Sequence, residues 1–180
     1  MILETPRLFL RPLSPQNILA LIEGDGAFLR SFGVAAATGF GGYLRSGEVS
    51  PRWRAALETA SEADPWTHGF AVIDRESNLV IGSVGFKGAP GPDGVVEIAY
   101  GIVPGLQRRG YATEAAAAGL QFAFANPSVR LVIAHTHPGS SASKRVLEKN
   151  GFSYIGDVED PEDGLVCRFE LARARFSPQP

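Results

Sequence analysis

Two patterns of hydrophobic residues alternate along the 180-residue chain. Runs in which apolar residues are continuous, or alternate with polar ones, are typical of β-strands. Apolar residues that recur every three or four positions are typical of helices with one buried face. These patterns predict strands over residues 8–13, 68–73, 79–86, 95–103, 129–136, 152–158 and 165–172. They predict helices over residues 15–22, 51–63, 113–124 and 140–150.

Residues with strong local preferences support several of these boundaries. Ser14 is a good N-cap and Pro15 a good first helical residue, so a helix is expected to begin there. Gly151 is suited to end the helix over residues 140–150. The segment over residues 33–47 is rich in glycine and alanine. It predicts a mobile loop or a broken helix.

The order of the elements predicts an α/β protein with a mixed sheet. The strand, helix and strand over residues 95–136 imply one parallel pair of strands, because a helical crossover returns the chain in the same direction. The final two strands form an antiparallel hairpin. Ligands of open α/β sheets bind at the carboxyl ends of strands. The turn after the strand over residues 95–103 is therefore the first candidate for a binding site.

This turn has the sequence Gln-Arg-Arg-Gly-Tyr-Ala over residues 107–112. It leads directly into a predicted helix, whose first N–H groups lack partners and whose dipole favours negative charge. Gly110 lets a ligand approach the backbone closely. Arg108 and Arg109 add positive charge suited to phosphate oxygens. The turn therefore predicts a site for a phosphorylated cofactor.

Composition narrows the class of protein. Acidic and basic residues nearly balance, with a formal net charge of −2, which argues against a general binder of nucleic acid or membrane surfaces. The single cysteine, Cys167, excludes an intramolecular disulfide and is expected in the core. The chain shows neither a basic-then-apolar leader nor an apolar run of bilayer length, so a cytoplasmic location is expected. One domain over residues 1–175 and a disordered tail over 176–180 are expected.

Four segments, taken in order, resemble the GCN5-related N-acetyltransferase (GNAT) superfamily, and within it the RimJ/RimL-like group that acetylates ribosomal-protein N-termini. The resemblance covers roughly residues 1–30 and 68–172 and implies the GNAT fold. In that fold a mostly antiparallel sheet contains one splayed parallel pair, with helices on both faces. Residues 33–66 match no recognisable pattern and are expected to form a variable segment on the acceptor side. The matching segments are residues 3–12, 96–100, 107–115 and 143–152.

The resemblance implies acetyl-CoA as the acetyl donor. Its pyrophosphate is expected to rest on the backbone N–H groups of the turn, and its pantetheine arm to pair like an extra strand with backbone around Tyr100 and Ile102. Ser140 stands where the group usually carries an asparagine that touches this arm. The residues expected to bind the cofactor are Tyr100, Ile102, Gln107, Arg108, Arg109, Gly110, Tyr111, Ala112, Thr113 and Ser140.

The expected reaction is direct attack of a primary amine on the thioester, with the acceptor either a protein N-terminal α-amine or a small amine. At pH 7 an α-amine costs only about 1 kcal/mol to deprotonate, against about 4.6 kcal/mol for a lysine side chain, which favours an α-amine. Glu97, a lone carboxylate in an apolar strand, is the candidate base, and a salt-bridged structural glutamate is the alternative. Ser143 is the candidate proton donor to the departing sulfur, and a helix serine bonded to backbone is the alternative. Leu147 stands where many superfamily members carry a tyrosine.

Other interpretations remain open. The chain could be a CoA-binding regulatory module with little or no turnover, whereas an NAD(P)-binding oxidoreductase lacks its Gly-x-Gly-x-x-Gly motif here. His135 and His137 share one strand face without a third ligand, so no metal is predicted, although His137 could line the acceptor pocket. A homodimer formed through the terminal hairpin is possible. Four aromatic residues could shape the acceptor site or simply pack in the core: Phe40, Tyr43, Trp53 and Trp66.

Overall fold

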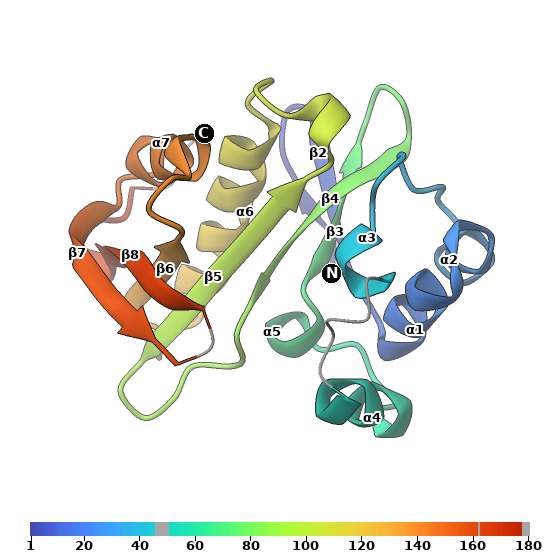
Figure 1. The fold of residues 1–180 in the computed structure, drawn as a ribbon, viewed down its shortest axis with the longest axis horizontal. Helices are drawn as coiled ribbons and strands as arrows, with labels where there is room; N and C mark the ends of the chain where they lie inside the picture. Colours follow the sequence, from blue (N-terminus) through green and yellow to red (C-terminus); the bar gives the residue numbers. More distant parts are fainter. Residues whose placement is uncertain (46–50, 162, 178–180) are drawn as a thin grey trace.

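A computed structural model describes residues 1–45, 51–161 and 163–177 (Figure 1). The described strands form one eight-stranded sheet in the order β1-β2-β3-β4-β5-β6-β8-β7. The strands are β1 (Leu3–Glu4), β2 (Leu8–Pro12), β3 (Phe70–Asp74), β4 (Leu79–Phe86), β5 (Val95–Ile102), β6 (Leu131–Thr136), β7 (Ser153–Asp160) and β8 (Gly164–Ala172). The helices are α1 (Pro15–Glu23), α2 (Asp25–Phe32), α3 (Gly42–Arg45), α4 (Pro51–Thr59), α5 (Pro65–His68), α6 (Tyr111–Ala125) and α7 (Ser141–Lys149), with 3-10 turns η1 (Pro104–Leu106) and η2 (Arg173–Arg175).

The sheet is antiparallel except at its centre, where β5 and β6 run parallel. Their pairing extends only from Val95 opposite Leu131 to Glu97 opposite Ile133. Beyond Glu97, β5 continues paired with β4 while β6 diverges from it (Figure 1). The predicted mixed sheet with one splayed parallel pair is therefore confirmed.

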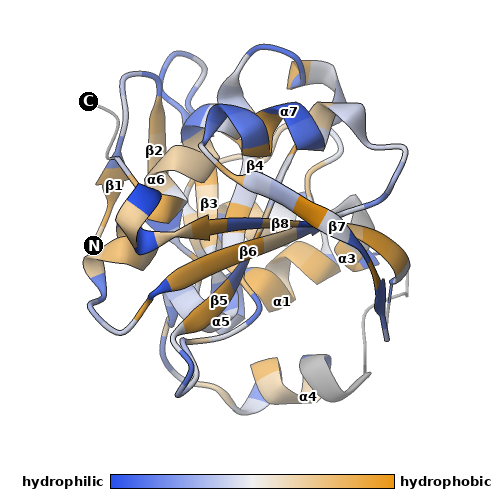
Figure 2. Cartoon of the chain, turned by 90° about the vertical axis from the view of Figure 1, so that its left-hand side faces the viewer, coloured by the Kyte–Doolittle hydropathy of each residue, from blue (hydrophilic) through white to orange (hydrophobic). Residues whose placement is uncertain are grey.

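Helices cover both faces of the sheet. α6 packs against β4 and β5 on one face, and α1 and α3 lie over the opposite face (Figure 1). Gly119 allows the close approach of α6, because a Cβ atom there would lie 2.9 Å from Cγ2 of Val84 and 3.3 Å from Cδ1 of Ile98. α7 packs against α6 and β6 and buries Leu147. Figure 2 shows the expected contrast between the hydrophobic strand β6 and the largely hydrophilic surface of α7.

Two short helices were not predicted from the sequence. In α2, Gly24 and Gly26 obscure the pattern, but Phe28 and Phe32 are buried and stack with ring centroids 5.0 Å apart. In α5, residues assigned in part to a strand form a helical turn instead. Asp64 caps this turn by accepting a hydrogen bond from the backbone N–H of Trp66 at 3.1 Å. The strand β3 consequently begins at Phe70.

The variable segment over residues 33–66 is only partly regular. Ala36 makes an isolated bridge to Val80, and the short helix α3 follows a turn over residues 38–41. Of the segment predicted as a mobile loop or a broken helix, residues 42–45 are helical and residues 46 and 47 lie outside the described residues. At the other end of the chain, Phe176, which was assigned to the tail, packs its ring on Phe124 with centroids 4.6 Å apart. Residues 178–180 of that tail lie outside the described residues.

Candidate active site

The predicted anion-binding turn lies between η1 and the first turn of α6. Arg108 and Gly110 both adopt left-handed backbone conformations, with φ of 61° and 83°. Within the part of the chain that the structure describes, no side chain caps the N-terminus of α6. The first N–H groups of this helix are therefore left to a ligand or to solvent, and the helix dipole adds positive potential there.

The opening segment of the chain holds this turn in place. The Arg7 guanidinium donates to the carbonyl oxygen of Arg109 at 2.9 Å and, through Nε, to Oε2 of Glu114 at 2.7 Å. The other carboxylate oxygen of Glu114 accepts from the Thr5 hydroxyl at 2.6 Å and from the Arg7 backbone N–H at 2.9 Å. Arg7 also lies over the Tyr111 ring at 4.7 Å. We call Thr5, Arg7 and Glu114 the N-terminal clamp.

Sequence reasoning missed the N-terminal clamp. It placed Arg7 and Glu114 in two separate segments that match the family and assigned no contact between them. An arginine and a glutamate can form an ion pair, and both residues lie in segments that match the family. Their contact joins positions more than a hundred residues apart, however, and a local sequence pattern does not predict such a contact. Burial alone would raise the pKa of Glu114, but the hydrogen bonds from Thr5 and Arg7 outweigh it, so the pKa lies below its usual value.

The N-terminal clamp gives a pH-dependent prediction. A depressed pKa in the folded state means that the Glu114 carboxylate stabilises the fold above its unfolded pKa of about 4.3, and that this contribution is lost as the pH falls through the folded value. At pH 7, Glu114→Gln should lower the free energy of unfolding by about 1 kcal/mol. The difference from the unmodified protein should shrink toward pH 3. Urea unfolding at both pH values measures it.

Glu4→Gln is the matched control for that prediction. Glu4 also pairs with an arginine, Arg75, at 2.9 Å, but its side chain is 64% exposed. Exposed ion pairs contribute little to the stability of the fold, so this variant should change the free energy of unfolding by less than about 0.5 kcal/mol. Equal losses in the two variants would contradict a special role for the clamp.

Tyr100 links strand β5 to helix α7. It extends from β5, and its hydroxyl donates to the backbone carbonyl of Ser143 in α7 at 3.2 Å. Burial raises the pKa of the Tyr100 phenol well above its usual value, so it stays protonated and can donate. The structure thus brings together two residues that the sequence assigned to the same site. Ser140 directly precedes α7, on the N-terminal side of Ser143.

The side chain of Gln107 makes a hydrogen bond within the protein. Its side-chain amide donates to the carbonyl oxygen of Ile102 at 2.9 Å. This bond fastens the turn to the end of β5 and occupies the Ile102 carbonyl. The backbone of Tyr100 is therefore better placed than that of Ile102 to pair with an extended ligand. Arg108, Arg109 and Gly110 are exposed at the surface of the turn.

Glu97 lies at the point where β5 and β6 separate. Its Oε1 is 3.0 Å from Nζ of Lys87 and 3.1 Å from Nδ1 of His135. The His135 contact is an approach rather than a well-formed hydrogen bond, since neither ring nitrogen meets hydrogen-bond geometry with a partner. Burial opposes the charge of Lys87, but Glu97, Asp160 and Asp163 outweigh it and raise the pKa of the ammonium. Glu97 therefore forms an ion pair, as expected if it is a structural glutamate, the alternative to its role as a base.

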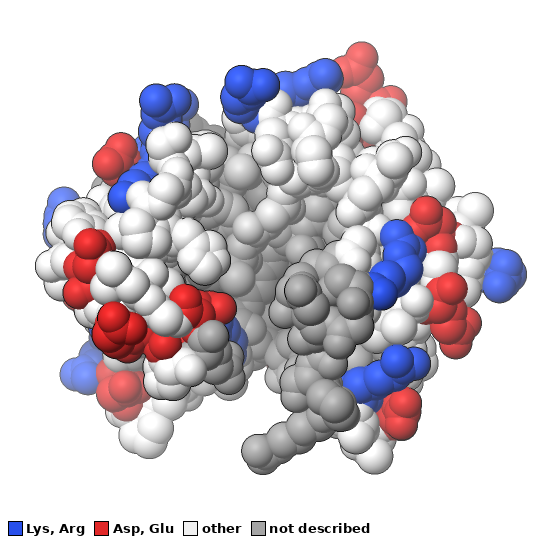
Figure 3. All heavy atoms as spheres, viewed as in Figure 1, with Lys and Arg blue, Asp and Glu red and all other residues white. Residues whose placement is uncertain are grey.

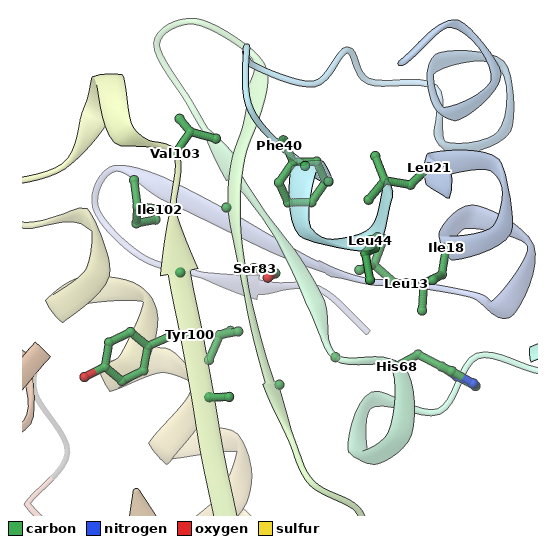
Figure 4. Close-up of a pocket in the computed structure, with 18 of the residues that line it drawn as sticks. Leu13, Ile18, Leu21, Phe40, Leu44, His68, Ser83, Tyr100, Ile102 and Val103 are labelled. Atoms are coloured by element: carbon green, nitrogen blue, oxygen red, sulfur yellow. The ribbon is translucent and has the colours of Figure 1, made fainter. Parts of the chain in front are cut away.

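A cavity of about 570 Å³ opens on this face, beside the separation of the strands (Figure 4). Its floor consists of small residues at two directly paired positions: Ser83 opposite Gly101, and Gly85 opposite Ala99. Because side chains alternate along a strand, the larger residues of β4 and β5 point to the other face. An apolar part of its wall comes from Leu13, Ile18, Leu21, Phe40 and Leu44, and Thr67, His68 and Lys87 also line it.

The aromatic residues considered for the acceptor site separate into two groups. Phe40 lines the cavity, whereas Trp66 packs against Phe86 and Phe122, each at 4.8 Å between ring centroids. The side chains of Tyr43 and Trp53 lie outside the described residues. His68 lines the cavity near its rim, and burial lowers the pKa of its imidazole despite the nearby charge of Asp64.

Two other residues singled out in the sequence, Cys167 and His137, do not line the cavity. Cys167 is 2% exposed, which confirms it as a core residue, and its contact with Asp157 raises the pKa of the thiol. His137 is exposed just beyond the end of β6. Among the residues that the structure describes, no cluster of three metal-ligating side chains occurs. In the same residues, no helix is long and apolar enough to cross a bilayer.

The protein has an α/β fold in which strands β5 and β6 separate within the sheet. The backbone N–H groups at the start of α6 have no side-chain cap. Residues 7–153 match the acetyltransferase (GNAT) domain family. The chain therefore belongs to the GNAT acetyltransferase family.

Relatives agree with this assignment. The uncharacterized N-acetyltransferase YjdG of Bacillus subtilis (strain 168) is 29% identical over 89 residues, covering 48% of this chain and 53% of that protein. The uncharacterized N-acetyltransferase YnaD of the same strain is 35% identical over 87 residues, covering 48% and 51%. The chain spans about half the length of these relatives. Among solved structures, RimJ of Mycobacterium smegmatis in complex with CoA-disulfide has a TM-score of 0.66 at 18% identity, covering 99% of this chain and 88% of that one, which supports the fold.

Proposed function

We propose that this protein is an acetyl-CoA-dependent N-acetyltransferase that transfers an acetyl group to a primary amine. The observation that carries the proposal is the turn over residues 107–112, whose uncapped amides lie at the carboxyl end of β5, next to the separation of β5 from β6. The turn supplies a place for a diphosphate, and the separation supplies a place for an extended arm. The cavity on the same face supplies room for an amine.

The residues of the turn fit a diphosphate. Gly110 has a positive φ, and a Cβ atom there would lie 3.2 Å from Nη2 of Arg7, so a side chain would crowd the turn. Arg108 and Arg109 add two exposed cations. A second cavity of about 540 Å³ lies beside the turn and is lined by residues of the opening segment, α6 and α7, including Lys149. Its size suits the nucleotide end of the donor, and its charged lining residues are two bases, Arg7 and Lys149, and two acids, Glu4 and Glu114.

The chemistry assigned to this chain is proton transfer. A nitrogen–carbon bond forms as the neutral amine attacks the thioester carbon, and the carbon–sulfur bond then breaks. Glu97 would accept the proton that the amine loses, through an intervening water. Ser143 would donate to the departing sulfur, since Tyr100 holds its backbone at the separation of the strands. Each transfer is general acid–base catalysis.

We further propose that the chain belongs to the RimJ/RimL-like group and acts on an α-amine. The likeness to RimJ in fold and the matching opening segment support this narrower assignment. So does the lower cost of deprotonating an α-amine at neutral pH, about 1 kcal/mol against about 4.6 kcal/mol for lysine.

Thiol release from acetyl-CoA in the presence of an amine panel tests the proposed function. Mass spectrometry of the products confirms the acetyl group on nitrogen. Release that depends on an amine supports an enzyme. Tight binding of CoA without release for any amine would instead identify the alternative, a regulatory module. Binding of NAD(P) in place of CoA, read as a thermal shift, would identify the oxidoreductase.

The role of Ser143 gives a separate prediction. Ser143→Ala should lower kcat about 10-fold, less than the roughly 100-fold or more typical of general acid–base catalysis, because a thiolate is a comparatively good leaving group. The bond from Tyr100 goes to the backbone and survives the substitution, so affinity for CoA should not change. Steady-state kinetics and calorimetry measure the two effects. Ser141→Ala, in the exposed first turn of α7, is the control, and equal rates in both variants would refute the assignment.

A further inference from the structure

His135 lies beside Glu97, and both nitrogens of its ring are buried. We propose that His135 is a positioning residue for the base: its Nδ1–H holds Oε1 of Glu97 and leaves Oε2 free to accept the proton of the amine. This inference rests on the proposed function, because it concerns the base of the same reaction.

The strand pattern brings these two residues to the same place. Pairing between β5 and β6 ends with Glu97 opposite Ile133. His135 follows two residues later in β6, so its side chain is on the same face of the sheet as Glu97. The next residues of β5 on that face are Ala99 and Gly101, which are small and line the cavity. His135 and Glu97 therefore meet where the strands separate, and Ala99 of the cavity floor follows roughly 7 Å along β5.

The imidazole of His135 lacks the hydrogen bonds that a buried ring normally makes. Its side chain is 11% exposed, and within the described part of the chain neither ring nitrogen has a partner of hydrogen-bond geometry. Nδ1 nevertheless lies 3.1 Å from Oε1 of Glu97. The ring can carry a hydrogen on Nδ1 whether it is neutral or charged. Hydrogen bonds between catalytic groups are often poorly aligned before the substrates bind, so this contact needs only a change of angle to form one.

The contacts of Glu97 are divided unequally between its two carboxylate oxygens. Lys87 and His135 both approach Oε1, at 3.0 and 3.1 Å. Among the described residues, no ion pair reaches Oε2. The backbone carbonyl of Glu97 also accepts from the backbone N–H of Lys87 at 3.0 Å, which fixes the strand here. A carboxylate held through one oxygen presents the other in a defined direction, as a general base requires.

His135 is the firmer of the two partners of Glu97. The Lys87 side chain is 45% exposed, and its ammonium also lies 3.9 Å from Oδ2 of Asp163. Asp160 adds to the negative charge around Lys87. Figure 3 shows acidic side chains gathered over the hairpin of β7 and β8, beside the hollow on this face. Lys87 is thus shared between Glu97 and the hairpin, and exposed ion pairs of this kind contribute little.

A charged neighbour of His135 on the next strand is engaged elsewhere. Arg168 stands opposite His135 in the pairing of β6 with β8. Its Nε donates to Oε1 of Glu170 at 2.8 Å. Arg168 therefore has a carboxylate of its own, and the imidazole is the group that β6 offers to Glu97.

Substitutions that remove or keep the donor test the inference. His135→Leu removes it and should lower kcat at least about 10-fold, with the dissociation constant of CoA unchanged. The asparagine amide can take the place of Nδ1, so His135→Asn should stay within about 3-fold of the unmodified protein. Kinetics with the fastest amine of the panel, and calorimetry with CoA, measure these effects. His137→Leu makes the same change at an exposed position beyond β6 and is the control, with kcat unaltered.

A double-mutant cycle shows whether His135 acts through Glu97. A residue that only positions Glu97 has nothing left to position once the carboxylate is removed. In protein that carries Glu97→Gln, His135→Leu should therefore change kcat less than about 2-fold. An equal fall of kcat in both backgrounds would overturn the inference. So would equal losses for leucine and asparagine, or full turnover in His135→Leu protein that folds and binds CoA.

The position of the ring hydrogen gives a measurement that does not depend on turnover. The chain has three histidines, and comparison with the His135→Asn variant identifies the nitrogen-15 NMR signals of His135. We expect hydrogen on Nδ1 in the complex with CoA. Hydrogen on Nε2 alone would overturn the inference and leave the N-acetyltransferase intact. Hydrogen on Nδ1 without thiol release for any amine would overturn the proposed function, and with it the role of His135, while the contact stands.

Discussion

Replacing Gly110 by tryptophan is expected to abolish binding of acetyl-CoA. Gly110 adopts φ of 83°, which costs a residue with a Cβ atom about 1–2 kcal/mol. The indole would also cover the amides at the start of α6 and collide with Arg7, whose Nη2 would lie 3.2 Å from the new Cβ. The dissociation constant of CoA should rise at least about 100-fold, equivalent to ~2.7 kcal/mol. Isothermal titration calorimetry measures it.

Two further variants test why Gly110→Trp is expected to lose affinity for CoA. Gly110→Asn should bind CoA far better than Gly110→Trp, because asparagine tolerates the left-handed conformation and is small. Gly26→Trp adds the same indole to an exposed position in α2, where a Cβ atom would be 3.6 Å from Nη1 of Arg30, and should bind CoA normally. Unaltered affinity in Gly110→Trp would mean that the diphosphate binds elsewhere, and the proposed function would lose its main support.

Replacing Glu97 by glutamine is expected to lower kcat at pH 7 by about 100-fold, with little change in affinity for CoA. Glutamine keeps the size of the side chain but cannot accept the proton that the amine releases. Glu97 lies on the cavity side of β5, at the end of the paired segment with β6. Steady-state kinetics with a saturating amine, and calorimetry with CoA, separate the effects on turnover and on binding.

Lys87→Met is the control that distinguishes a base from a structural ion pair. It removes the same contact, 3.0 Å between Nζ of Lys87 and Oε1 of Glu97, while it keeps the carboxylate. If Glu97 is the base, Lys87→Met should retain most of the turnover that Glu97→Gln loses. If the two variants lose turnover equally, the ion pair is what matters, and Glu97 is a structural residue.

Local patterns in the sequence were sufficient to predict the elements around the proposed donor site. The turn, the helix after it and the parallel strands around it follow one another closely in the chain, so periodicity and glycine placement could locate them, while the roles of Gly110 and Glu97 stay predictions. The burial of Cys167 followed from its position in an alternating strand. These features depend on neighbours within a few residues, which is the range over which a sequence pattern carries information.

The features that the sequence did not predict depend on contacts between distant segments. The bond from Arg7 to Glu114 joins positions 107 apart. Helix α2 is stabilised by the packing of Phe28 and Phe32 rather than by its composition, which includes poorly helical glycine. The apolar cavity wall comes from α1 and the chain around α3, over a floor supplied by β4 and β5. No single segment contains the pattern of that cavity.

The floor and the apolar wall of the cavity come from different segments of the chain, which bears on how the protein can change by mutation. The small pairs, Ser83 with Gly101 and Gly85 with Ala99, belong to the same strand ladder that leads to the donor turn. The wall belongs to an N-terminal helical segment that the ladder does not need for its pairing. Under the proposed function, substitutions in that segment would alter the amine that is accepted and leave the residues proposed to bind the thioester unchanged.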